Sequence, residues 1–296
     1  MKRIRTVPFL LFFYSSLWAG LADVSPGKSG ASFMRVPVSA RQKALAGSGF
    51  ALTGIDFAEE NPASVMGAEG ALQFSRVMYF EGLALNNARF LFNFESYNPY
   101  DGVNKENFLC LGIRSFSFSD DKTDMLTGAK TGNFAVNDKS IYLTYGFTAG
   151  GAQAGITVKM ISENIDNNSS SAKAFDLGFI TGGGEYFSIA SSVRNIGGKI
   201  SGSPLPLTVS LGAAVKGEFV TFTAGAEKTR EESLILSVGG EDEINNLTLR
   251  LGAKYQSVVE PAAGFGIKWH SFSFDYAVSY HKYLGGNHLF TVQIKL

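Results

Sequence analysis

The stretch NHLFTVQIKL, residues 287–296, alternates apolar and polar side chains. Read at every second residue, one face carries His288, Phe290, Val292, Ile294 and Leu296. The opposite face carries Leu289, Thr291, Gln293 and Lys295. A period of two is typical of a half-buried strand. Soluble domains usually finish in a polar, poorly ordered tail. The last ten residues, 287–296, are instead predicted to form a strand, and we expect this strand to pair with another strand of the same chain.

The same alternation continues through most of the chain. Clear examples occupy residues 141–148, 153–160, 207–216, 247–255, 263–269 and 272–280. We count about fourteen such segments, most of them near the 9–11 residues that a membrane-spanning strand requires. In NFLCLGIRSFSFSD, residues 107–120, the apolar positions change parity after Ile113, which predicts a β-bulge near Arg114. ALQFSRVMYF, residues 71–80, is the weakest strand candidate.

Such segments build either a soluble β-sandwich or barrel, or a transmembrane barrel. The polar face of the segments is mild, since it consists mainly of Gly, Ser, Thr and Ala, and the charges gather in the connections. Short connections such as 149–152 and 216–218 also alternate with long ones such as 120–139 and 162–173. Both features favour an all-β, transmembrane antiparallel β-barrel of about 14 strands. Its last strand is expected to close on the first, near residues 72–80.

Composition and the N-terminus agree with a membrane location. The chain is 13% aromatic and only 18% charged, which is too apolar for disorder. Residues 1–22 have the basic start, apolar centre and small-residue end of a signal peptide. We expect residues 23–67 to form a short plug-like segment, periplasmic or luminal, and residues 68–296 to form the barrel. Without residues 1–22, 26 basic residues fall by three to 23, against 26 acidic ones, so nucleic acid is not an expected partner.

Sequence motifs for catalysis are weak. ADVSPGKS, residues 22–29, matches a relaxed P-loop pattern but lacks the strand before it and the helix after it. The single cysteine, Cys110, excludes a disulfide framework, and three scattered histidines do not predict a metal site. The adjacent carboxylates Glu59 and Glu60 are interpreted as part of a solvated turn. We therefore expect no catalytic residues, no cofactor and no metal: the protein is not expected to be an enzyme.

Three stretches carry a family resemblance. Residues 31–65, ASFMRVPVSARQKALAGSGFALTGIDFAEENPASV, resemble the N-terminal signature of the PorV/PorQ family of bacterial outer-membrane proteins, which are FadL-like barrels. The matching positions there include Arg41, Gly47, Asn61 and Pro62. A second stretch matches at Asn195, Gly197 and Pro206. The C-terminal stretch, which includes the closing strand, matches at Asp275, Tyr276, Leu284, Gly285 and His288, and continues through Phe290 to Leu296. Leu296 itself stands where such barrels commonly have an aromatic residue.

The resemblance implies a role in type IX secretion. Its best-known members collect secreted proteins and deliver them to a surface attachment complex. We therefore expect, first, a non-catalytic docking or shuttle protein of the bacterial outer membrane. The alternatives are a FadL-like channel for small apolar molecules and a structural outer-membrane protein. The expected partners are outer-membrane lipid, the barrel assembly machinery, secreted cargo proteins and other secretion components.

Overall fold

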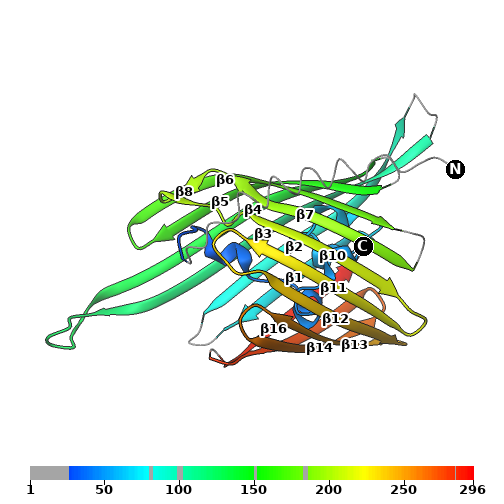
Figure 1. Cartoon of the computed structure of the whole chain (residues 1–296). Helices are drawn as coiled ribbons and strands as arrows, with labels where there is room; N and C mark the ends of the chain where they lie inside the picture. Colours follow the sequence, from blue (N-terminus) through cyan, green and yellow to red (C-terminus); the bar gives the residue numbers. More distant parts are fainter. Residues whose placement is uncertain (1–26, 80–82, 99–102, 150–151, 183–185, 284) are drawn as a thin grey trace.

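The computed structural model describes residues 27–79, 83–98, 103–149, 152–182, 186–283 and 285–296. Within these residues, fourteen strands form one closed antiparallel barrel (Figure 1). Sequence neighbours pair around the whole ring, except that β7 pairs with β10 across a small two-stranded sheet. The expected all-β barrel of about 14 strands is confirmed. The expected signal peptide, residues 1–22, and Leu284 lie outside the described residues.

The strands differ widely in length. The barrel consists of β1 Ala71–Met78, β2 Ala84–Asn98, β3 Val103–Thr123, β4 Lys130–Ala149, β5 Ala152–Ile165, β6 Asn168–Gly182, β7 Phe187–Gly197, β10 Thr208–Lys216, β11 Val220–Thr229, β12 Ile235–Ile244, β13 Leu247–Tyr255, β14 Val259–Trp269, β15 Phe272–His281 and β16 Gly285–Lys295. The small sheet consists of β8 Lys199–Ile200 and β9 Ser203–Pro204. We call the end of the barrel where Leu296 lies the C-terminal end and the opposite end the loop end, since the longest connection, residues 198–207, is there.

The first and last strands close the barrel. β1 pairs with β16 in one continuous register, from Ala71 opposite Lys295 to Met78 opposite His288. The backbone N–H of Leu296 extends the pairing by donating to the carbonyl of Gly70 at 3.0 Å. A bilayer offers no water to an unpaired strand edge, so closure satisfies backbone groups that would otherwise cost several kcal/mol each. The predicted pairing of residues 287–296 with the weak first segment is confirmed.

The outer surface of the barrel is apolar. Val292 on β16 is 40% exposed, whereas its neighbour Thr291 faces the interior and is fully buried. The same alternation leaves large apolar side chains on the outside of neighbouring strands, among them Phe74, Phe90, Leu111, Leu143, Val158, Phe175 and Leu249. A continuous apolar belt of this kind requires a lipid environment. No helix among the described residues is long and apolar enough to span a bilayer.

Two sequence-based expectations are wrong in detail. The connections expected at residues 120–139 and 162–173 are mostly strand. The first is the end of the β3–β4 hairpin, which runs on beyond the neighbouring strands (Figure 1), and the second is the end of the β5–β6 hairpin. The bulge expected near Arg114 is also absent from the β2–β3 and β3–β4 pairings. Phe116 keeps the inward parity of Arg114 and packs on an apolar cluster inside the barrel. A register break occurs instead in the β6–β7 pairing, between Phe175 and Leu177.

The apolar belt predicts a position-dependent response to charge. Leu143→Arg places a cation among lipid-facing side chains and should destabilise the barrel by about 2–4 kcal/mol if it lies near the midplane. Leu126→Arg is the matched control, because Leu126 is 96% exposed at the tip of the β3–β4 hairpin. Urea unfolding in lipid vesicles, followed by heat-modifiable gel migration, measures both. Equal stability of the two variants would contradict a lipid-facing belt at Leu143.

Candidate functional site: a luminal plug between two cavities

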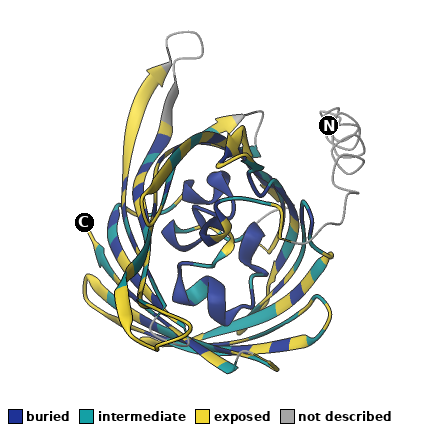
Figure 2. Cartoon of the chain, turned by 90° about the vertical axis from the view of Figure 1, so that its left-hand side faces the viewer, coloured by how far each residue is buried: buried dark blue, intermediate teal, exposed yellow. Residues whose placement is uncertain are grey.

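Most of residues 27–70 lie in the interior of the barrel (Figure 2), and the exposed positions include residues near both ends of this range. Their short helical elements are η1 Ser32–Arg35, α2 Ala40–Ala44, η2 Gly49–Ala51, η3 Ile55–Phe57 and η4 Pro62–Val65. We call residues 27–70 the plug. Nearly all residues from 38 to 66 are buried. The plug enters near the loop end, where Gly30 N–H donates to the Pro204 carbonyl, and leads into β1 at the C-terminal end.

Glycines on the inner face of the strands make room for the plug. A Cβ atom on Gly155 would lie 2.3 Å from the backbone of Pro62, and one on Gly252 would lie 2.6 Å from the backbone of Leu45. Gly212 likewise lies under Phe50. Any side chain at these strand positions would collide with the plug. The mildly polar, glycine-rich face of the strands is therefore a surface on which the plug packs, and not the lining of a water-filled channel.

The Asn-Pro pair of the family resemblance caps one plug element. The Asn61 side-chain oxygen accepts from the Ala63 N–H at 3.1 Å, which caps η4, and Pro62 occupies the first turn. The Asn61 side-chain nitrogen donates to the Phe50 carbonyl at 2.9 Å. The side chain lies directly over Gly178 of β6. Asn61 thus joins two plug elements to each other and to the barrel wall.

A buried ionic anchor holds Glu59 of the plug. Arg89 of β2 contacts its carboxylate at 3.1 Å and Arg114 of β3 contacts it at 2.5 Å. The hydroxyl of Tyr142 on β4 donates to the same carboxylate at 2.9 Å. Arg89 also donates to the Ile55 carbonyl at 2.6 Å. The Arg89 and Glu59 side chains are 0% and 3% exposed, so the anchor is shielded from water. The interpretation of Glu59 and Glu60 as a solvated turn is wrong, since both are buried.

A second anchor holds Arg41 at the C-terminal end. Its guanidinium binds the Glu241 carboxylate of β12 with two hydrogen bonds, of 3.0 and 2.5 Å. Arg250 of β13 joins Glu241 to Asp275 of β15, at 3.1 and 2.6 Å. The structure thereby brings together Arg41 and Asp275, which the resemblance named separately. This anchor is more hydrated than the first, because the Arg41 side chain is 23% exposed.

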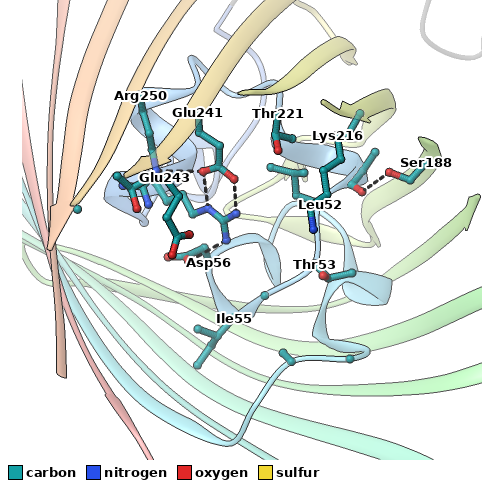
Figure 3. A pocket seen from close by; sticks show the side chains of 18 of the residues that line it. Leu52, Thr53, Ile55, Asp56, Ser188, Lys216, Thr221, Glu241, Glu243 and Arg250 are labelled. Atoms are coloured by element: carbon teal, nitrogen blue, oxygen red, sulfur yellow. Dashed lines mark hydrogen bonds and ion pairs between the residues drawn. The ribbon is translucent and has the colours of Figure 1, made fainter. Parts of the chain in front are cut away.

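Two cavities flank the plug. The mouth cavity, of about 910 Å³, lies at the C-terminal end and includes Leu52, Thr53, Asp56, Glu241 and Arg250 in its lining (Figure 3). The inner cavity, of about 100 Å³, is lined by Lys43, Phe50, Glu60, Arg194 and Glu260, among others. Plug residues 41–51 contribute to both linings: Arg41 and Ala51 face the mouth cavity, whereas Gln42, Lys43, Ala46, Gly47 and Phe50 face the inner one. We call residues 41–51 the partition.

The second stretch that resembles the PorV/PorQ family, with Asn195, Gly197 and Pro206, lies at the β6–β7 register break near the loop end. Asn195 has a left-handed backbone (φ 58°), and its N–H donates to Asp176 of β6 at 2.7 Å. Its side-chain amide donates to the Pro206 carbonyl at 3.1 Å, so the connection folds back onto β7. Gly197 passes so close to the Lys173 carbonyl that a Cβ would lie 2.4 Å from it. These residues shape the wall and the connection, and do not contact either cavity.

The residues of the closing strands divide between the two faces. Asp275 points inward to Arg250, whereas the Tyr276 hydroxyl meets His288 Nδ1 on the outside at 2.7 Å. The Phe290 ring lies 5.1 Å from the Tyr276 ring, centroid to centroid. Gly285 begins β16 with a left-handed backbone (φ 78°). The described residues contain no group of three or more His, Cys, Asp or Glu side chains arranged to hold a metal ion.

Sequence reasoning missed the Glu59 anchor. Arg89, Arg114 and Tyr142 come from three strands, and no local motif connects them to each other or to the plug. The available signal was the parity of the arginines, because each falls on the polar, inward face of an alternating strand. An arginine on that face of a filled barrel needs an acidic partner. Only the path of the plug through the barrel shows that Glu59 is the acidic partner of these arginines.

Comparison with known proteins gives relatives in structure alone. No protein-family model matches the chain, and no curated protein matches it in sequence. A solved deletion mutant of TodX, titled a monoaromatic hydrocarbon channel, is similar with a TM-score of 0.63 and 11% identity, covering 87% of this chain and 99% of that one. The Ralstonia pickettii toluene transporter TbuX is similar with a TM-score of 0.56 and 11% identity, covering 87% of this chain and 98% of that one. A Pseudomonas aeruginosa FadL homologue is similar with a TM-score of 0.55 and 11% identity, covering 87% of this chain and 98% of that one.

These neighbours define the class of fold. They include a FadL homologue, a monoaromatic hydrocarbon channel and a toluene transporter. Together with the lipid-facing belt, the fold makes this chain a bacterial outer-membrane β-barrel of FadL-like architecture.

The Glu59 anchor predicts a large and specific loss of stability. Glu59→Gln leaves the Arg89 and Arg114 charges buried without a counter-charge, which should cost about 3–5 kcal/mol. Glu69→Gln is the control, because Glu69 pairs with Lys295 at the surface and such pairs contribute about 0–1 kcal/mol. Urea unfolding in vesicles compares the two variants. A loss below about 1 kcal/mol for Glu59→Gln would show that the pair does not anchor the plug.

The glycine contacts predict that one methyl group disturbs the plug. In Gly178→Ala the new Cβ would lie 2.0 Å from the Asn61 side-chain oxygen, so the Asn61 cap must move. Gly198→Ala is the control, since nothing lies within 4 Å of a Cβ there. We expect a lower thermal unfolding midpoint and increased ion conductance in planar bilayers for Gly178→Ala only. Identical midpoints and conductance in the two variants would count against close packing of the plug on β6.

Proposed function

We propose that the protein is a FadL-like channel that conducts small apolar molecules across the outer membrane. The observation that carries the proposal is the partition: eleven residues of plug, 41–51, separate two cavities inside one barrel. An internal pathway interrupted by a movable segment is what a gated channel requires. Two structural neighbours, a monoaromatic hydrocarbon channel and a toluene transporter, support small apolar molecules as the cargo.

The two anchors suggest how the partition opens. The Glu59 anchor is excluded from water, and breaking it would leave buried charges without partners. The Arg41 anchor begins the partition and borders the mouth cavity, where water can replace its hydrogen bonds at lower cost. We infer that the partition rearranges from the Arg41 side while Glu59 keeps the rest of the plug attached to β2 and β3.

A docking or shuttle role in secretion, which the PorV/PorQ resemblance implies, is the second candidate. The observation in its favour is the β3–β4 hairpin, which projects from the loop end and carries the exposed apolar side chains Met125 and Leu126 at its tip. Such a tip suits contact with a partner protein. The structural neighbours favour the channel, so we rank docking second. Co-purification of secreted proteins that carry a C-terminal sorting domain, lost on deletion of residues 120–134, would favour it.

A reversible lock on the partition tests the channel. Ser48 Oγ lies 2.5 Å from Thr223 Oγ1 of β11, so Ser48→Cys with Thr223→Cys, in a Cys110→Ser background, is suited to a disulfide. Expressed in Gram-negative cells that lack FadL-type channels, the unlocked protein should raise the uptake of radiolabelled toluene above the empty host. Oxidation should return uptake to the empty-host level, and a reductant should restore it.

The two single-cysteine variants are the controls and should respond to neither oxidant nor reductant. Wild-type uptake equal to that of the empty host would overturn the channel itself. Undiminished uptake with complete cross-linking would overturn the gating role of the partition. Cross-linking is measured separately by gel migration with and without reductant.

A further inference from the structure

A polar row crosses the outer surface of six adjacent strands, β1 to β6. Arg76 of β1 lies opposite Asn86 of β2, Asn86 opposite Ser115 of β3, and Ser115 opposite Lys139 of β4. The row continues through Ser162 and Ser171, and Lys173 of β6 lies two residues beyond Ser171. The members of this row, which we call the outer polar row, are Arg76, Asn86, Ser115, Lys139, Ser162, Ser171 and Lys173.

The side chains of this row point outward, away from the plug. Their chain neighbours Ser75, Ser140 and Ala174 are buried inside the barrel, and alternation along a strand puts adjacent residues on opposite faces. One step along the same outward faces, towards the C-terminal end, the side chains are apolar and exposed, and they include Phe74, Ile113, Ile141, Met160 and Phe175. The outer polar row therefore borders the lipid-facing belt at the side of the loop end.

The row carries three positive charges and no negative one. The Arg76 guanidinium donates to the Asn86 side-chain oxygen at 3.5 Å. Among the described residues, no carboxylate pairs with Arg76, Lys139 or Lys173. The nearest acidic residues along these strands, Asp138 and Asp176, face the interior and are buried. The luminal Lys159, by contrast, is paired with Asp176 at 2.5 Å. An unbalanced positive field therefore faces the membrane side of this sector.

The spacing suits a ligand with more than one phosphate. Arg76 and Lys139 are three strands apart, which is about 14 Å at the usual strand separation. Lys139 and Lys173 are two strands and two residues apart, or about 12 Å. The serines and Asn86 between them supply hydrogen-bond donors. A partner that contacts both this row and the belt below it needs phosphate groups and acyl chains in one molecule.

We propose that the outer polar row binds a phosphorylated, acylated glycolipid of the outer leaflet. Longer loops of bacterial outer-membrane barrels are extracellular, which puts the loop end, and this row, at the outer leaflet. The cations contact the phosphates, and the apolar side chains below them contact the acyl chains. This site is on the outside of β1 to β6 and is independent of transport through the lumen.

The test uses purified full-length protein in a non-ionic detergent, with lipid A carrying two phosphates as the probe. Wild type should bind it at least about tenfold more tightly than the same lipid without phosphates, since each cation near an anionic lipid adds to affinity. Native mass spectrometry measures the bound fraction. The variant Arg76→Gln, Lys139→Gln and Lys173→Gln should lose that preference, and single substitutions should lose part of it.

The control variant Lys228→Gln, Arg230→Gln and Lys282→Gln removes the same charge from positions outside β1 to β6 and should keep wild-type binding. Heat-modifiable migration checks that both variants are folded. Equal binding of lipid A with and without phosphates would overturn the proposal, as would an equal loss in the control variant. Competition by millimolar inorganic phosphate as strong as that by lipid A would assign the row to free phosphate instead.

Discussion

The pairing of β1 with β16 is the contact on which the rest of the structure depends. In a bilayer the backbone groups of a strand edge have no water to bond, so a sheet becomes stable there only when its ends meet. Ala71 opposite Lys295 and Met78 opposite His288 fix the register of that meeting. Once the ring is closed, each strand has one face in lipid and one in an enclosed lumen. The apolar outside and the glycine-rich inside both follow from this division.

An enclosed lumen must also be filled or left to water, and here the plug fills most of it. Strand glycines such as Gly155 and Gly252 let the plug backbone approach the wall directly. Among the ion pairs that hold the plug, the anchor around Glu59 is shielded from water, whereas the anchor around Arg41 lies beside the mouth cavity. Their difference in hydration divides the plug into a fixed part and a part that water can help to release. The partition belongs to the second part, and the proposed gating rests on that asymmetry.

The outside of the barrel is not uniform either. Over β1 to β6 the apolar belt ends at a row that includes Arg76, Lys139 and Lys173, whereas the charges of the lumen are mostly paired with one another. Most cations in the lumen meet a carboxylate of the plug or of a facing strand, as Arg114 and Lys159 do. A cation on the outside can be balanced only by what the membrane brings. The same side-chain type thus serves internal packing on one face and recognition of lipid on the other.

The sequence by itself determined the strands and their closure, because alternation is a local property and the bilayer leaves one way to satisfy a final strand such as residues 287–296. It did not determine strand length at β3 and β4, where polar residues extend a hairpin that pairing within the hairpin maintains. It did not reveal the Glu59 anchor, because Arg89 and Arg114 meet that acid only through the path of the plug. Tertiary structure likewise decided the two cavities and the partition between them. Their positions depend on which strand glycine each plug residue contacts. These contacts join segments far apart in the chain, so no single segment of the sequence predicts them.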